Sequence, residues 1–178
     1  GMYQAYGGNM DEGWTRLLLE QFGFPYASLD ADAVAGGDLA ADYDVIILPE
    51  DDLDDMMGER GEGGRYGAGA GIPPGFRAGF GQEGVDALEA FVEVGGTLVT
   101  FSGAGELPLE AFDVPVRNVV DGVPSTEFWA YGSTLRVDVN TDHPLAWGMP
   151  ERALVVYFGD SQVYGVSAYG EGHRIERV

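Results

Sequence analysis

Apolar residues in the first two thirds of the chain form short runs that alternate with segments of helical periodicity. The run DVIILP, residues 44–49, is almost continuously apolar, which is typical of a central parallel strand covered on both faces. Four strands are predicted in this part of the chain, at about 2–6, 25–29, 44–49 and 97–101. Their alternation with helices predicts an α/β fold with a doubly wound, mostly parallel sheet.

Two of the segments between these runs have the period of amphipathic helices. The first covers about 10–22, where Asn9 is a natural N-cap and Glu12 completes the pattern of a capping box. The second covers 83–94 and stops at a pair of glycines. A short helical turn is expected at 32–35. The side chains expected to face the interior are Trp14, Leu17, Leu18 and Phe22 in the first helix and Val85, Leu88, Phe91 and Val92 in the second.

The last third of the chain has a different pattern, and a long connection precedes the fourth strand. Residues 135, 137 and 139 are apolar between polar neighbours, as in a half-exposed strand, and strands are also expected at 153–158 and 162–168. The connection at about 50–81 is acidic and then glycine-rich, and we expect a mobile loop or lid. No linker-like tract divides the chain, so a single domain over 1–178 is predicted. Gly1 before Met2 has the form of an expression scar.

The charge balance limits the classes of partner. Asp and Glu number 30 against 9 basic residues, for a formal net charge of -21, and every basic residue is arginine. Such a surface repels nucleic acid phosphates and anionic lipid headgroups, so we expect neither nucleic acid nor membrane partners. The chain has no cysteine, which excludes disulfides and thiolate metal sites. A small molecule, another protein domain and a second copy of the chain remain as partner classes.

Small and polar residues gather where the predicted parallel strands end. In open α/β sheets, ligands bind at the carboxyl ends of the strands. The residues expected to form a ligand crevice there are Gly8, Asn9, Glu50, Asp51, Ser102, Gly103 and Ala104. Such a crevice would suit a small molecule or a carbohydrate.

Two blocks of sequence carry a resemblance to a known family. NMDEGWTRLLLEQFGFPYASL (9–29) and STLRVDVNTDHPLAWGMP (133–150) resemble the C-terminal domain of bacterial zinc carboxypeptidases of the carboxypeptidase A type. That domain has the class I glutamine amidotransferase-like fold, which is flavodoxin-like. The likeness covers most of the chain, including DYDVIILP, GVDALEAFVEVGGTLV and PVRNVV. The family's domain continues with further strands, so the resemblance implies a truncation near HRIERV.

The resemblance places Ser102 where amidotransferases carry the catalytic cysteine, with Gly103 after it and Glu12 as a loose counterpart of an orienting carboxylate. A serine hydroxyl is a weak nucleophile unless a base accepts its proton. The chain has two histidines, His143 and His173, and the spacing of neither suggests such a base. Thr100 also replaces the first glycine of the G-x-S-x-G elbow. We therefore interpret Ser102 as a degenerate, inert nucleophile position and expect no catalytic residue. For Glu12, helix capping is the stronger interpretation.

Three further motifs have a structural interpretation that is stronger than the functional one. EDDLDD (50–55) lacks the register of a calcium loop and is interpreted as a solvated acidic loop, without a metal site. The turn at 102–105 could bind an anion through its backbone N–H groups, but the acidic residues nearby oppose this. GAGAG (67–71) follows no strand and is not a phosphate loop. Trp129, Tyr131 and Trp147 are expected to serve packing, in the core or at a rim.

The resemblance implies a non-catalytic accessory domain that packs on, or modulates, the peptidase domain of the same parent protein. Zinc then belongs to that peptidase domain, and no cofactor is expected in this segment. An extracellular or periplasmic location is implied by the family alone. Two alternatives remain: a small-molecule or carbohydrate-binding module that uses the crevice, and a serine hydrolase or amidotransferase that uses Ser102.

Overall fold

The computed structural model describes residues 1–59, 79–158, 162–166 and 174–178. The chain divides into two compact units, Gly1–Phe112 and Asp113–Val178, which are described separately. The single domain predicted over 1–178 stays a prediction. None of the helices in the described ranges has the length and apolar character needed to cross a membrane.

The first unit contains a parallel sheet of four strands. These are β1 (Met2–Tyr3), β2 (Ser28–Leu29), β3 (Val45–Leu48) and β4 (Thr97–Thr100), in the order β2-β1-β3-β4. Strands β3 and β4 pair over four positions, from Val45 opposite Thr97 to Leu48 opposite Thr100. The parallel α/β architecture predicted from the alternation of strands and helices is confirmed, and the strand order is compatible with a flavodoxin-like sheet.

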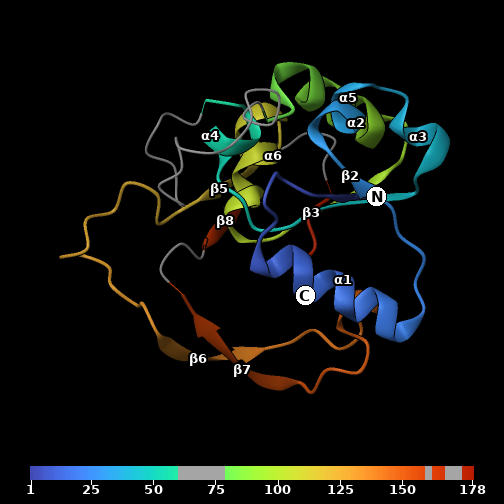
Figure 1. Ribbon diagram of the computed structural model, residues 1–178. Helices are drawn as coiled ribbons and strands as arrows, with labels where there is room; N and C mark the ends of the chain where they lie inside the picture. The colour runs from blue at the N-terminus through green and yellow to red at the C-terminus, as the bar shows by residue number, and fades with distance from the viewer. Residues whose placement is uncertain (60–78, 159–161, 167–173) are drawn as a thin grey trace. The chain divides into compact units, whose positions relative to one another are not determined.

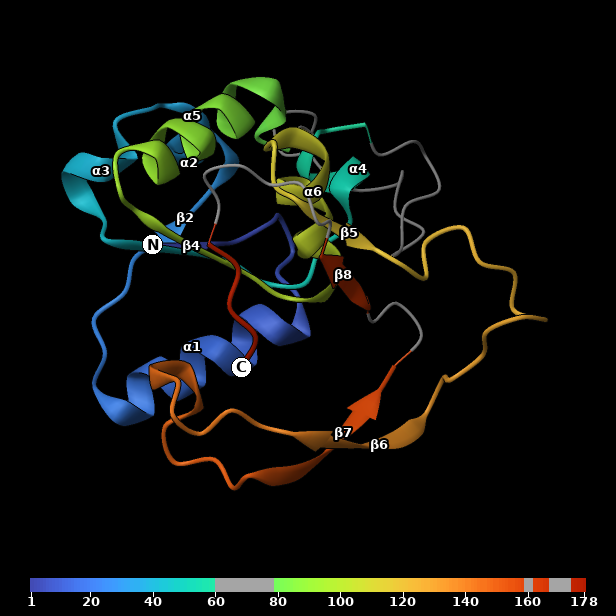
Figure 2. The ribbon, with the colours of Figure 1, turned by 180° about the vertical axis from the view of Figure 1, so that it is seen from behind.

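Six helices accompany this sheet in the described part of the first unit: α1 (Met10–Phe22), α2 (Ala31–Ala35), α3 (Leu39–Asp42), α4 (Leu53–Met56), α5 (Gly81–Glu93) and α6 (Glu106–Ala111). Figure 1 shows α2, α3 and α5 on one side of the sheet and α1 on the other, and Figure 2 shows the same arrangement from behind. The predicted helix at 10–22 is confirmed with its N-cap. The predicted helix at 83–94 corresponds to α5, and the predicted turn at 32–35 corresponds to α2.

The hydrophobic core lies on the side of the sheet that carries α2, α3 and α5. Ile46 and Leu48 of β3 are fully buried there together with Leu88 of α5. The other members of this core cluster are Tyr3, Leu29, Val34, Leu39, Met56, Phe80, Val85, Phe91, Ala104 and Leu107. The burial of alternate β3 residues follows from the pleat, which points neighbouring side chains to opposite faces.

Three expectations about burial are wrong. The face of α1 formed by Trp14, Leu17, Leu18 and Phe22 is exposed, and Glu12 is the buried residue of that helix. Val92 of α5 is exposed as well. The second face of strand β3 is covered only in part, because Val45 is exposed and Ile47 is half-buried. In each case the periodicity identified an apolar position correctly, but periodicity does not say whether a neighbouring element covers it.

The second unit consists of two antiparallel strand pairs and a short turn. Strand β5 (Val116–Asn118) pairs with β8 (Tyr164–Val166), and β6 (Ser133–Asp138) pairs with β7 (Arg152–Tyr157). The 3-10 turn η3 (Pro144–Ala146) lies in the connection between β6 and β7. The strands predicted from the alternation at 135–139 and from the run at 153–158 are confirmed as β6 and β7. The end of the strand predicted at 162–168 lies outside the described residues.

Candidate functional site

The carboxyl ends of β1, β3 and β4 are joined by two short contacts. The side-chain nitrogen of Asn9, which follows β1, donates a hydrogen bond to the backbone carbonyl of Glu50, which follows β3, at 2.6 Å. Gly103, which follows β4, lies so close to the segment after β3 that a Cβ on it would stand 2.9 Å from the carbonyl oxygen of Asp51. These contacts bring most of the residues of the predicted crevice together, as the parallel sheet requires.

Asn9 connects this site to the start of α1. Its Oδ1 accepts a hydrogen bond from the backbone N–H of Glu12 at 2.7 Å, which makes it the N-cap of the helix. Because its Nδ2 is bonded to Glu50 at the same time, one side chain fixes both the first turn of α1 and the loop after β3. The site is therefore anchored by backbone groups on two sides.

Glu12 is the buried charged residue of the described ranges, with a relative exposure of 3%. Its Oε1 forms an ion pair with Arg16, one turn along α1, at 3.3 Å from Nη1, but has no hydrogen-bond partner among the described residues. Its Oε2 would lie 3.8 Å from a Cβ placed on Gly8. A buried carboxylate oxygen without a hydrogen bond carries a desolvation cost and would accept a donor supplied by a ligand.

Ser102 lies at a strained corner between β4 and the 3-10 turn η2 (Ser102–Gly105). Its φ is 47°, in the left-handed region that residues other than glycine seldom adopt. Ser102 is exposed, while Ala104 behind it is fully buried in the core cluster. Strained backbone of this kind often accompanies a functional site, and sequence patterns gave no sign of it. The corner thus combines a strained backbone with an exposed serine.

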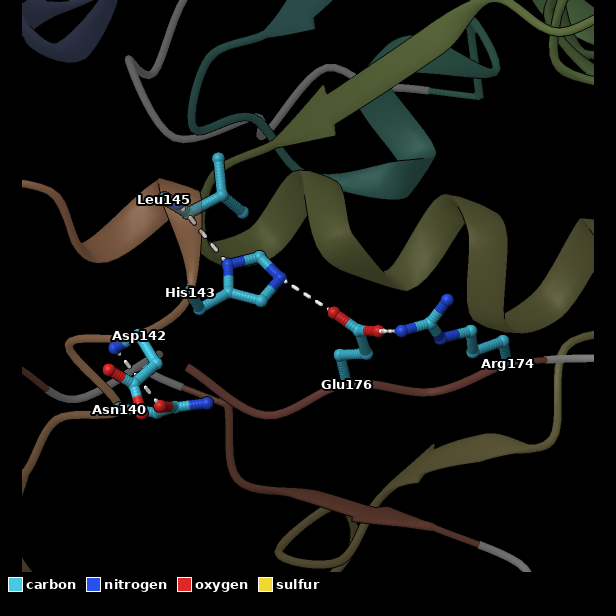
Figure 3. A network of polar contacts seen from close by, with 6 residues as sticks. All are labelled: Asn140, Asp142, His143, Leu145, Arg174 and Glu176. Carbon is cyan, nitrogen blue, oxygen red and sulfur yellow. Dashed lines mark hydrogen bonds and ion pairs between the residues drawn. The ribbon is translucent and has the colours of Figure 1, made fainter.

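His143 could serve a serine only if one of its ring nitrogens were available. In the second unit, its Nδ1 accepts a hydrogen bond from the N–H of Leu145 at 3.2 Å, and its Nε2 lies 2.8 Å from Glu176 Oε2 (Figure 3). Both nitrogens are therefore engaged. The other histidine, His173, lies outside the described residues. The part of the chain that the structure describes supplies no histidine with a nitrogen to accept a serine proton.

The acidic segment 50–55 is partly helical. Residues 53–56 form α4, and the N–H of Asp52 is bonded to Asp51 Oδ1 at 3.1 Å. Across the described ranges, no group of three His, Cys, Asp or Glu side chains could hold a metal ion. Part of the predicted mobile loop at 50–81 and the whole of GAGAG at 67–71 lie outside the described residues.

Three aromatic residues of the second unit, Trp129, Tyr131 and Trp147, are not core residues. Trp129 and Tyr131 stack with their ring centroids 5.9 Å apart, and both side chains are exposed, as is Trp147. Tyr131 also contacts Phe158 edge to face. The stacked pair and Trp147 are therefore surface features.

Comparisons of the chain with models of protein families, with curated proteins and with solved structures find no match.

Proposed function

We propose that this chain is a non-catalytic accessory domain of a zinc metallocarboxypeptidase, with a degenerate class I glutamine amidotransferase-like site. The four parallel strands in the order β2-β1-β3-β4 support the finer fold assignment, because a flavodoxin-like sheet has the same order. The sequence blocks 9–29 and 133–150 support the family. A fold of this type hosts many functions, so the proposal depends on the site.

The observation that carries the proposal is a strained serine corner for which the described residues supply no histidine base. Ser102 keeps a left-handed φ at the end of β4, where a nucleophile would stand. Its hydroxyl needs a proton acceptor to react, yet the chain has no cysteine and His143 is bonded through both nitrogens. A corner that keeps a strained backbone and has no histidine base among the described residues supports a degenerate enzyme domain.

The exposed face of α1 supports a packing role. Trp14, Leu17, Leu18 and Phe22 place four large apolar side chains on one helical face. Contiguous exposed apolar surface of this kind is uncommon on a protein that works alone and is typical of a contact with another domain. The partner proposed here is the peptidase domain of the same polypeptide, which would carry its own zinc ligands.

The first test is the reading frame that encodes the chain. It is expected to encode a zinc-peptidase domain on the same polypeptide, and a frame without one would overturn the proposal. In the intact protein, Ser102→Ala should leave carboxypeptidase kcat/KM unchanged. A hydrolase or amidase activity that is lost in this variant, or labelling of Ser102 by a fluorophosphonate, would instead support the hydrolase alternative.

The second test concerns the α1 face in that intact protein. Leu17→Asp is expected to separate the thermal unfolding of the accessory domain from that of the peptidase domain, because it places a charge in the contact. Val94→Asp is the matched control, since it adds the same charge at another exposed apolar position. Equal behaviour of the two variants would argue against docking through α1.

A second candidate function, a small-molecule or carbohydrate-binding module, is favoured by Glu12. Its buried Oε1 would accept a hydrogen bond from a hydroxyl or ammonium group of a ligand at the strand ends. The test is thermal unfolding in increasing concentrations of glucose, N-acetylglucosamine and glycylglycine. One of them should raise the Tm of the wild type and not that of Glu12→Gln, each compared with its own ligand-free sample. No concentration-dependent shift with any of the three would count against this function.

A further inference from the structure

The turn η3 in the second unit presents two large apolar side chains to solvent. Leu145 is 81% exposed and Trp147, just after the turn, is 92% exposed. The N-cap of this turn is His143, whose Nδ1 accepts the hydrogen bond from the N–H of Leu145. Caps are usually Ser, Thr, Asp or Asn, whose capping oxygens do not gain a proton near neutral pH. A histidine cap differs because its acceptor atom can take up a proton.

The second ring nitrogen connects the turn to the segment 174–178. Nε2 of His143 lies 2.8 Å from Glu176 Oε2, and the other carboxylate oxygen of Glu176 pairs with Arg174 (Figure 3). Because Nδ1 accepts a backbone N–H, the proton of the neutral ring resides on Nε2 and is donated to Glu176. One imidazole therefore holds the turn through one nitrogen and the segment through the other.

The charged groups that face the ring are few among the described residues. Glu176 lies at Nε2, and Arg174 pairs with the other carboxylate oxygen of Glu176. The N–H of Leu145 lies at Nδ1. Asp142 precedes the ring in the chain, and its own N–H is bonded to Asn140 Oδ1 at 3.3 Å.

We propose that His143 is a proton-operated cap, which releases η3 when the ring is protonated while the contact with Glu176 persists. The only nitrogen that can take a second proton from solvent is Nδ1, since Nε2 already carries one. Once Nδ1 carries a proton it becomes a donor, so the N–H of Leu145 loses its acceptor. Nε2–H still faces Glu176, and the hydrogen bond becomes an ion pair. The mobility of Leu145 and Trp147 would therefore follow the protonation of this ring.

The experiment is nuclear magnetic resonance of the ¹⁵N-labelled chain between pH 8 and pH 5. At pH 8 the ring of His143 should show the Nε2–H tautomer. As the ring gains its proton, the amide of Leu145 should shift with the same midpoint, and its protection against exchange should fall about fivefold, as expected for a lost cap. The indole resonance of Trp147 should move with the same midpoint.

Two variants separate the cap from the contact with Glu176. His143→Asn keeps an N-cap acceptor that does not titrate, so the pH response of Leu145 should disappear. Glu176→Gln keeps an acceptor for Nε2–H but removes the charge, so the amide of Leu145 should still change together with the ring. The proposal is overturned by an Nδ1–H tautomer at pH 8, by a Leu145 amide that does not follow the ring, or by a pH response that survives in His143→Asn.

Discussion

Gly103→Ala tests whether the ends of β3 and β4 are in contact at the candidate site. A Cβ on Gly103 would lie 2.9 Å from the carbonyl oxygen of Asp51, closer than Cβ contacts in proteins, and the obstacle is backbone, which cannot rotate away. The φ of Gly103 is not in the left-handed region, so the penalty is steric and not conformational. Overpacking of this kind costs typically about 1–3 kcal/mol.

Gly13→Ala in α1 is the matched control because nothing lies within 4 Å of its Cβ position. Alanine is favoured over glycine inside a helix by about 0.5–1 kcal/mol, so this variant should be stabilised. The two free energies of unfolding should therefore differ by about 1.5–4 kcal/mol, the sum of the steric cost and the helix gain.

The measurement is urea unfolding of both variants and the wild type, followed by far-ultraviolet circular dichroism and analysed with a common m-value. Gly103→Ala should unfold at lower urea than the wild type and Gly13→Ala at higher urea. If Gly103→Ala proves as stable as Gly13→Ala, the close approach of Gly103 to the backbone of Asp51 is refuted.

Three other expectations follow from single contacts. Leu88→Ala, in the core, should lower the free energy of unfolding by about 2–5 kcal/mol, whereas Leu18→Ala on the exposed face of α1 should change it by less than about 0.5 kcal/mol. Asn9→Ala should cost about 1–2 kcal/mol in urea unfolding because both the N-cap and the bond to Glu50 are lost; a cost near zero would contradict the bridging role. The hydroxyl of Tyr26 donates to Glu20 at 2.6 Å, and this hydrogen bond raises the pKa of Tyr26 above its ordinary value of 10.0. The bond therefore stabilises the fold below pH 10 and is lost as pH rises through the raised value, so Glu20→Gln should move one tyrosine transition in the absorbance titration to lower pH, and an unchanged titration would refute the assignment.

Local sequence signals predicted the elements of the first unit well. Asn9 marks the start of α1, where the structure has an N-cap, and the helix ends at Phe22, as its apolar period predicted. The run at 44–49 marks β3. The predicted crevice residues follow from the rule on parallel strand ends, and the contacts of Asn9 and Gly103 bring three of those ends together.

The features that escaped prediction depend on distant parts of the chain. Strand β5 has three residues and pairs with β8, whose residues lie far along the sequence, so no local pattern identifies it. The bond from Asn9 to Glu50 spans 41 positions. The left-handed φ of Ser102 was not foreseen, because serine rarely adopts that conformation and only the surrounding fold imposes it.

Helix α1 has hydrogen-bonded caps at both ends, but most of its large apolar side chains do not pack against the rest of the protein. Asn9 fastens its first turn, and the N–H groups of Gly23 and Phe24 return to the carbonyls of Glu20 and Leu19 at its last. Between these ends Glu12 is buried and the large apolar side chains are not. A molecule that covered this face would therefore bury apolar side chains on a helix whose two ends are already fixed by hydrogen bonds.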